Sequence, residues 1–163
     1  MNAAQTILTK LNEIFAPMDA EVLAASQEWA RGRVAAVHAF KRSDEGEALR
    51  RNQWGYYPRL YAIAGGKTWY NIFDGRTPAM VETVVEKNCA AVVAKRNATI
   101  AAKLEKAGVT EVVSEEFART SDGFDGVFIV NTDAGKKRVA INTVRAGGYN
   151  VQCLHLRVLI NIK

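Results

Sequence analysis

The stretch TPAMVETVVEKNCAAVVAKRNATIAAKLEKA, residues Thr77 to Ala107, is the longest run in the chain with the pattern of a single helix. Thr77 is suited to cap the first turn with its hydroxyl, and Pro78 falls at the first helical position, where a missing N–H costs nothing. Gly108 follows at a position that often requires a positive φ. The sequence therefore predicts one helix, about 46 Å long at roughly 1.5 Å per residue.

Apolar residues recur along one side of this predicted helix, while most charged residues fall elsewhere. Valine and threonine are weak helix formers, so we expect tertiary packing rather than intrinsic propensity to stabilise the helix. Because the helix is longer than a small domain needs, we expect part of it to project, kink or contact a partner. The residues of the apolar side are Val81, Val85, Cys89, Val92, Val93, Ile100 and Leu104.

After Gly108 the pattern of apolar residues changes from helical to alternating, which is typical of strands. We predict four strands joined by short links rich in turn residues, and three successive hairpins of this kind form an up-and-down antiparallel meander. In the last strand alternate residues are apolar, as expected for a sheet with one face on the core and one largely in water. The predicted strands are Thr110–Arg119, Gly126–Thr132, Arg138–Ala146 and Asn150–Ile162.

The N-terminal part of the chain has helical patterns. Residues 2–15 are amphipathic, with Asn2 as the cap and Gln5 three residues on, and Pro17 is expected to end this helix. A second helix is predicted from Asp19 to Lys41, and so short a link favours an antiparallel helical hairpin. The charged segment 42–51 is expected to form a turn followed by at most a short helix.

Together these elements predict an α+β fold, in which the N-terminal helical hairpin and one long central helix pack on a C-terminal four-stranded antiparallel meander sheet. We expect residues 1–163 to form a single domain, mainly helical over 1–107 and built from strands over 108–163. No apolar run approaches the roughly 20 residues of a membrane span, and the first residues do not resemble a signal peptide. A cytoplasmic protein without membrane contact is therefore expected, and exposed edge strands leave a homodimer open.

Positive charge is concentrated in two blocks of the chain, and the net charge is +5. Lys and Arg outnumber Asp and Glu 9 to 4 in residues 51–107 and 6 to 1 in residues 132–163. If the two blocks meet in space, they form a basic face that attracts nucleic acid, an acidic protein surface or a phosphorylated ligand. If they do not meet, the same residues are solvated surface charges.

Cysteine and histidine are scarce, which argues against a metal centre. Cys89 and Cys153 fall on different predicted elements and are expected to be small buried side chains rather than a disulfide. His38 and His155 lie far apart in the sequence, and no paired Cys or His-Glu spacing accompanies them. We therefore predict no bound metal and no cofactor.

The segment NQWGYYPRLYAIAGGKTWYNIFDGR, residues Asn52 to Arg76, combines crowded aromatic rings with basic residues. One interpretation is a compact connection whose rings pack in the core while their OH or NH groups find partners. The other is a binding surface, because aromatic faces stack on bases and cations bind phosphates. The candidate ligand-binding residues are Trp54, Tyr56, Tyr57, Arg59, Lys67, Trp69, Tyr70 and Arg76.

Glycine and proline give this segment an expected internal structure. Pro58 is suited to open a short helix, and the pair Gly65 and Gly66 is suited to end it. Asp74 and Gly75 predict a turn directly before the long helix.

A different candidate site lies on the polar face of the last predicted strand. His155 and Arg157 are two residues apart, so their side chains are expected to point the same way. Such a pair can transfer a proton and hold an anion, with Asn142 or Thr143 of the neighbouring strand joining them according to the register. A solvated sheet face carries residues of this kind routinely, and no carboxylate or serine is placed to complete a catalytic group.

The runs AGGYNVQCLHLRVLINIK and GGKTWYNIFDGR resemble parts of small uncharacterised proteins carried by bacteriophages and prophages. The resemblance implies a bacterial host cytoplasm and a role in phage–host interaction such as counter-defence, and it supplies no catalytic residues.

From these observations we predict a basic binding protein, rather than an enzyme, that recognises nucleic acid or an acidic host protein through the aromatic segment and the nearby sheet. The alternative is an enzyme or sequestering protein for a nucleotide-like phosphorylated ligand, centred on His155 and Arg157. A structural or assembly role is the third possibility.

Overall fold

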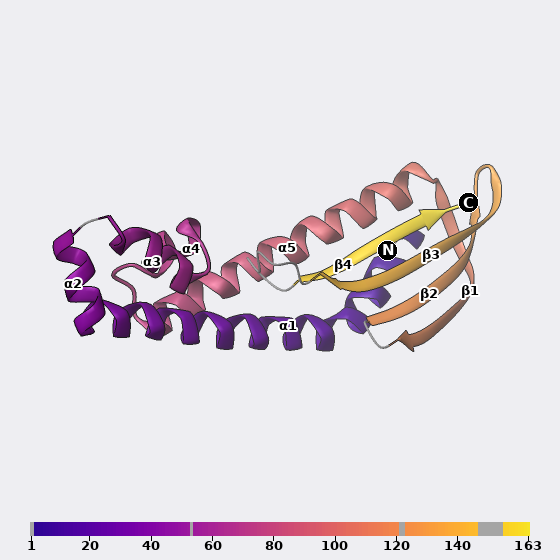
Figure 1. Cartoon of the computed structure of the whole chain (residues 1–163). Coiled ribbons are helices and arrows are strands. Elements are labelled where there is room, and N and C mark those ends of the chain that lie inside the picture. The colour runs from indigo at the N-terminus through magenta and orange to yellow at the C-terminus, as the bar shows by residue number, and fades with distance from the viewer. Residues whose placement is uncertain (1, 53, 121–122, 147–154) are drawn as a thin grey trace. The chain divides into compact units, whose positions relative to one another are not determined.

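The computed structural model describes residues 2–52, 54–120, 123–146 and 155–163, without the side chains of residues 144–146 and 155–157. Helices come first along the chain and an antiparallel sheet comes last, which confirms the predicted α+β class (Figure 1). The helices are α1 (Ala3–Arg42), α2 (Asp44–Asn52), α3 (Tyr56–Ala64), α4 (Lys67–Phe73) and α5 (Pro78–Lys106). The strands are β1 (Val109–Thr120), β2 (Gly123–Thr132), β3 (Gly135–Ala146) and β4 (His155–Ile162).

These elements form two compact units, each with its own core. The described part of unit 1 consists of residues 2–22, 90–120, 123–146 and 155–163, and that of unit 2 consists of residues 23–52 and 54–89. The long helices α1 and α5 each contribute one part to unit 1 and the other part to unit 2. The expectation of a single domain stays a prediction.

In unit 1 the four strands lie in chain order, β1-β2-β3-β4, and every neighbouring pair is antiparallel. The predicted meander is therefore confirmed. Gly135, with φ of 105°, follows the tight turn between β2 and β3, where a residue with a side chain would be strained. The predicted turn between the last two strands and the start of the predicted fourth strand fall in residues 147–154, outside the described residues.

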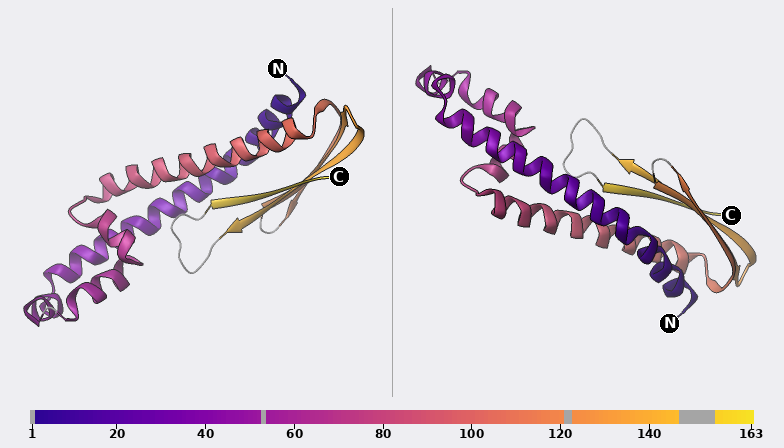
Figure 2. Two further views of the ribbon diagram at one scale, coloured as in Figure 1. Left: turned by 90° about the horizontal axis from the view of Figure 1, so that it is seen from above. Right: turned by 90° about the horizontal axis from the view of Figure 1, so that it is seen from below.

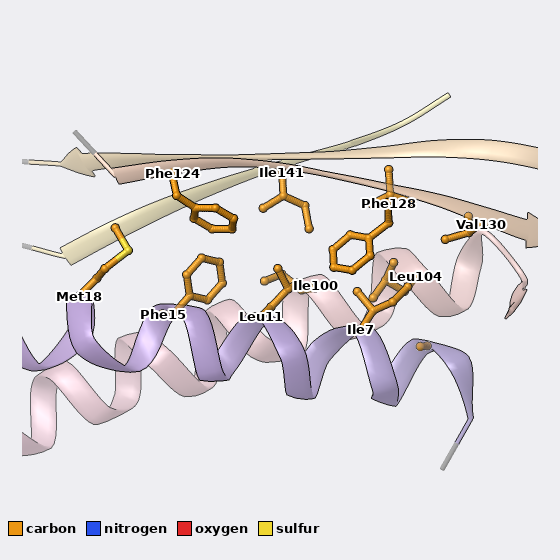
Figure 3. Packing of buried hydrophobic residues seen from close by; sticks show 12 residues of the cluster. Ile7, Leu11, Phe15, Met18, Ile100, Leu104, Phe124, Phe128, Val130 and Ile141 are labelled. Atoms are coloured by element: carbon orange, nitrogen blue, oxygen red, sulfur yellow. The ribbon is translucent and has the colours of Figure 1, made fainter. Parts of the chain in front are cut away.

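The core of unit 1 lies between the sheet and two helices. The first part of α1 and the last part of α5 cover the same face of the sheet (Figure 2). Phe15 of α1 packs edge-on against Phe124 of β2, with ring centres 5.4 Å apart, and Phe128 lies farther along the same strand (Figure 3). The buried residues of this core are Ala4, Ile7, Leu11, Phe15, Met18, Ile100, Leu104, Phe124, Phe128, Val130, Val139 and Ile141.

The predicted long helix is confirmed as α5, and its ends have the expected chemistry. The Thr77 hydroxyl accepts a hydrogen bond from the Met80 N–H at 3.3 Å, and Gly108 has a φ of 67°. Only its C-terminal part, with Ile100 and Leu104, packs on the sheet. Val85, which we expected at the interface with the sheet, is instead buried in the helical core of unit 2.

The predicted N-terminal hairpin is wrong, because α1 is one helix that contains Pro17. Its start is as expected: Gln5 N–H donates to Asn2 Oδ1 at 2.9 Å and Asn2 N–H donates to Gln5 Oε1 at 3.2 Å. An interior proline costs about 3 kcal/mol. The apolar stripe of α1 continues past it from Phe15 to Met18, and burying this stripe against the sheet offsets the cost.

The secondary structure in the described part of unit 2 is helical. The segment predicted as a turn and a short helix is α2, whose first turn is capped by the Ser43 hydroxyl. The predicted helix around Pro58 is α3, and Gly65, with a φ of 94°, ends it. Helix α4 was not expected from the sequence. The buried residues of this second core are Ala30, Val34, Val37, Phe40, Leu60, Ala64, Trp69, Tyr70, Phe73, Val81 and Val85.

Candidate nucleic-acid interface

The aromatic segment divides into buried and exposed rings. Trp69 and Tyr70, on α4, belong to the core of unit 2, with the ring of Trp69 stacked on that of Phe73 at 5.3 Å. These two residues were candidates for ligand binding, and their burial makes them packing residues instead. The interpretation of the segment as a compact core connection therefore holds for its second half.

The exposed rings come from the first half of the segment. Trp54, in the turn between α2 and α3, is 89% exposed, and Tyr57, in the first turn of α3, is 52% exposed. Arg59 and Lys67 are exposed as well. Arg76 is half-buried and donates to the Ile72 carbonyl at 2.5 Å, which assigns it to the end of α4 rather than to a ligand surface.

Tyr57 is the outer member of a connected group of tyrosines. Its ring centre lies 5.4 Å from that of Tyr56, 6.2 Å from that of Tyr61 and 6.3 Å from that of Tyr70. Tyr56 in turn lies 6.0 Å from Phe40 at the end of α1. The exposed ring is therefore held by rings beneath it, which limits the entropy lost when a ligand stacks on it.

Lys41 covers the buried end of this group. Its ammonium group forms an ion pair with Asp74 and lies 5.4 Å from the ring centre of Tyr70. Burial works to lower the pKa of Lys41, but the hydrogen bond to Asp74 and the attraction of Tyr70 and Asp74 raise it above its ordinary value of 10.5. Burial raises the pKa of Tyr70 above its ordinary value of 10.0, although Lys41 opposes this. Neither group is activated as a nucleophile or base near neutral pH.

Three exposed arginines lie on the two helices that flank Trp54 in the chain. Arg50 and Arg51 form the last turn of α2, and Arg59 lies on α3. Their partners are carboxylates of α2, with Glu47 3.1 Å from Arg50 and Glu45 3.5 Å from Arg59. All of these side chains are at the surface, where an ion pair contributes about 0–1 kcal/mol. A phosphate can therefore replace a carboxylate at little cost.

Comparison with protein-family models, curated proteins and solved structures finds no match for this chain. None of the helices in the described part of the chain combines the length and apolarity needed to cross a membrane. The functional argument therefore rests on the chemistry of the side chains.

A hollow of about 480 Å³ follows one side of α1 in unit 2. Trp29 is half-buried and lines this hollow together with the small residues Ala25, Gly32 and Ala36. The guanidinium of Arg33 lies 5.5 Å from the Trp29 ring centre and donates to the Ile63 carbonyl at 3.0 Å. Because Arg33 already lies against the Trp29 ring, Trp29 is a poorer stacking platform than Trp54.

Three lysines of unit 1 come together where α5 ends. Lys103 and Lys106 of α5 and Lys137 of β3 line a hollow of about 290 Å³ beside β4. Lys103 and Lys106 belong to the basic block 51–107 and Lys137 to the block 132–163, and the sequence left open whether these blocks meet. The predicted single basic face that also adjoins the aromatic segment involves both units and stays a prediction.

The alternative site on the last strand is only partly described. The register pairs His155 with Ala146 and Arg157 with Val144, and the side chains of both candidate residues lie outside the description. Thr143 is not available to them, because it is buried and its hydroxyl accepts from the Phe124 N–H at 2.5 Å. Asn142 is exposed and donates to Asp125 at 2.7 Å.

The two cysteines and His38 add no further chemistry to the described residues. Cys89 packs at the margin of the core of unit 2, and Cys153 lies outside the described residues. His38 is half-buried on α1. Within the described ranges, no three His, Cys, Asp or Glu side chains gather in a way that would hold a metal ion.

Proposed function

We propose that this chain is a binding protein for single-stranded nucleic acid and that Trp54 and Tyr57 are its stacking residues. The observation that carries this proposal is the exposure of Trp54, which at 89% is the highest among the large apolar side chains of the described residues. An indole in water forfeits the free energy that its burial would contribute. Stacking on a base recovers it, at about 1–3 kcal/mol per base.

The phosphate contacts in this proposal come from Arg50, Arg51, Arg59 and Lys67. The arginines lie on the two helices that flank Trp54, so a strand whose base stacks on the indole has cations close to its backbone. Each cation that neutralises a phosphate releases a counterion, which gives a salt dependence of about −0.7 per contact for a single strand. The phage–host role implied by the sequence resemblance belongs to this proposal and has no structural support of its own.

Fluorescence anisotropy with labelled single-stranded and double-stranded DNA and RNA tests the proposal. Trp54→Ala should weaken binding by about 1–3 kcal/mol without changing the log–log salt slope, because stacking releases no counterion. Replacing Arg51 and Arg59 together by Gln should flatten the slope by up to about 1.4, two contacts at about −0.7 each.

Two matched variants control for general effects. Met80→Ala removes another exposed apolar side chain of unit 2, and Arg31→Gln removes an exposed arginine that pairs with Glu82 at 2.6 Å. Both should leave affinity and slope unchanged. If none of the nucleic acids binds at low salt, or if Met80→Ala weakens binding as much as Trp54→Ala, the proposal is wrong.

A further inference from the structure

β4 is an edge strand of the described sheet, with β3 on one side only (Figure 1). Lys163 directly after it exchanges two backbone hydrogen bonds with Arg138, at 2.8 and 3.0 Å. Because hydrogen-bonding directions alternate along an antiparallel strand, the N–H and C=O groups of Val158, Ile160 and Ile162 point away from β3. This edge therefore presents a row of donors and acceptors for an additional strand.

The C-terminal end of α5 lies beside this edge. Lys103 donates to the Ile160 carbonyl at 3.3 Å, which confirms that this carbonyl faces outward. Lys103, Lys106 and Lys137 line the hollow of about 290 Å³ there, together with Ala107 and residues 160–162. The lysines of α5 and Lys137 lie on the helix side of the sheet, since Lys137 pairs with the buried Val130.

We propose that the β4 edge binds an extended acidic peptide of a partner protein as a fifth strand. Main-chain hydrogen bonds to Val158, Ile160 and Ile162 provide the part of the affinity that does not depend on the sequence of the peptide. Every second side chain of the added strand faces the α5 side, where carboxylates meet Lys103, Lys106 and Lys137. Aspartate or glutamate at alternating positions is thus the expected recognition pattern.

The chemistry of this edge favours a peptide over nucleic acid. None of the described residues that line the hollow is aromatic, so bases find no platform for stacking among them. Backbone groups that no neighbouring strand pairs, in contrast, need a partner with the same alternation. The site shares no residue with the proposed nucleic-acid interface, so either can fail without the other.

β1, at the opposite edge of the sheet, is less suited than β4 to pair with an additional strand. β1 has register irregularities between Val109 and Glu111 and between Val112 and Ser114, which disturb the row of backbone groups. It also carries exposed glutamates at positions 111, 115 and 116, which repel an acidic segment. β1 is therefore protected against strand addition in the way that natural edge strands often are, and β4 is the edge that accepts an acidic partner.

Isothermal titration with a synthetic peptide of alternating glutamate and threonine tests the proposal on the full chain. Three control peptides separate the contribution of charge from that of main-chain hydrogen bonds. One has lysine in place of glutamate. The other two are N-methylated at every second residue, one at the odd and one at the even positions. We expect binding by the acidic peptide, loss of binding with the lysine peptide, and loss with one N-methylated peptide. Hydrogen exchange at the amides of Val158, Ile160 and Ile162 should slow when the acidic peptide is bound.

Charge variants of the protein give an independent readout. The double variant Lys106→Gln with Lys137→Gln should weaken peptide binding at least tenfold. Its matched control, Lys87→Gln with Lys95→Gln, removes two exposed lysines from the same long helix and should have no effect.

Several outcomes overturn the proposal. One is equal binding of both N-methylated peptides, which would indicate an anion site without strand pairing. Another is displacement of the peptide by an oligonucleotide of equal charge at equal concentration. A third is absence of binding at about 1 mM peptide, the weak end of specific affinities, including the case in which the edge is closed by a second copy and the protein has the mass of a dimer.

Discussion

The carboxylate of Asp19 accepts two parallel hydrogen bonds from the guanidinium of Arg96, at 2.8 and 2.7 Å. The Arg96 side chain is only 7% exposed, and its guanidinium lies 4.5 Å from the ring centre of Phe15. Its Nε is buried without a hydrogen-bond partner among the described residues. Asp19 is thus the group that compensates a cation buried between α1 and α5 in unit 1.

We expect Asp19→Ala to lower the free energy of unfolding by about 3–5 kcal/mol, because Arg96 would keep its charge in a buried position. Lys10→Ala is the control, since Lys10 pairs with Glu115 at the surface, and it should cost about 1 kcal/mol or less. Urea denaturation measures both. Replacing both partners by apolar residues, Asp19→Leu with Arg96→Met, should recover most of the loss; a double variant as unstable as Asp19→Ala would contradict this explanation.

The core of unit 1 should be sensitive at Phe128, which is fully buried and packs edge-on against Phe117 at 5.2 Å. Phe128→Ala is expected to cost about 3–5 kcal/mol through lost burial and the cavity left behind. Leu159→Ala, at an exposed position of the same sheet, should change stability by about 0.5 kcal/mol or less. Equal effects of the two substitutions in urea denaturation would rule out the described packing.

Pro17 leaves the Glu13 carbonyl without its helical hydrogen bond, because proline has no N–H. Pro17→Ala should therefore stabilise the protein by about 1–3 kcal/mol, the gain in the helix being reduced by the greater entropy of the unfolded chain. Pro58→Ala is the matched control. Pro58 lies in the first turn of α3, where its N–H would have no helical partner, so this change should not stabilise. Thermal unfolding monitored by circular dichroism distinguishes the two results.

Alkaline pH should weaken unit 2 through Lys41 and Tyr70. Both groups have a pKa above the ordinary value in the folded protein, so the folded state holds their protons more tightly than the unfolded state does. Their contribution to stability is complete below the ordinary values of 10.0 and 10.5 and is lost as the pH rises through the higher folded values.

The Tyr70 part of this effect can be isolated with Tyr70→Phe, which keeps the ring and removes the titrating hydroxyl. Denaturant unfolding at several pH values from neutral upward should show a smaller alkaline loss in this variant than in the original protein. An identical pH dependence would mean that Tyr70 does not contribute.

The strands were predictable because one residue in two faces the core, and the turn residues between them are of standard types. The ends of α5 were predictable because Thr77, Pro78 and Gly108 act locally. The break at Pro17 was predicted wrongly, since a local rule about proline was outweighed by burial of Phe15 and Met18 against a sheet more than a hundred residues away in sequence. Helix α4 is too short to show a helical period.

The candidate interface was predictable in composition but not in detail. An aromatic ring has the same sequence signature in a core and on a surface, so nothing local separated Trp69, which is buried, from Trp54, which is exposed. The lysine-lined hollow at β4 depends on contacts between distant segments. The paired charges of Asp19 and Arg96 were missed for the same reason.

Along the chain, the described part of unit 2 lies within unit 1. It falls between a part of unit 1 that contains the start of α1 and a part that begins inside α5. The two helical parts of unit 1 can therefore meet only after this long segment has been closed into a loop, at an entropic cost that grows with the logarithm of its length. Once unit 2 has folded, its two chain ends are held at a fixed separation, so the loop that must still be closed is effectively shorter. Folding of the nested helices is thus expected to precede docking of the sheet, and a short linker in place of Leu23–Cys89 would convert unit 1 into a miniature protein.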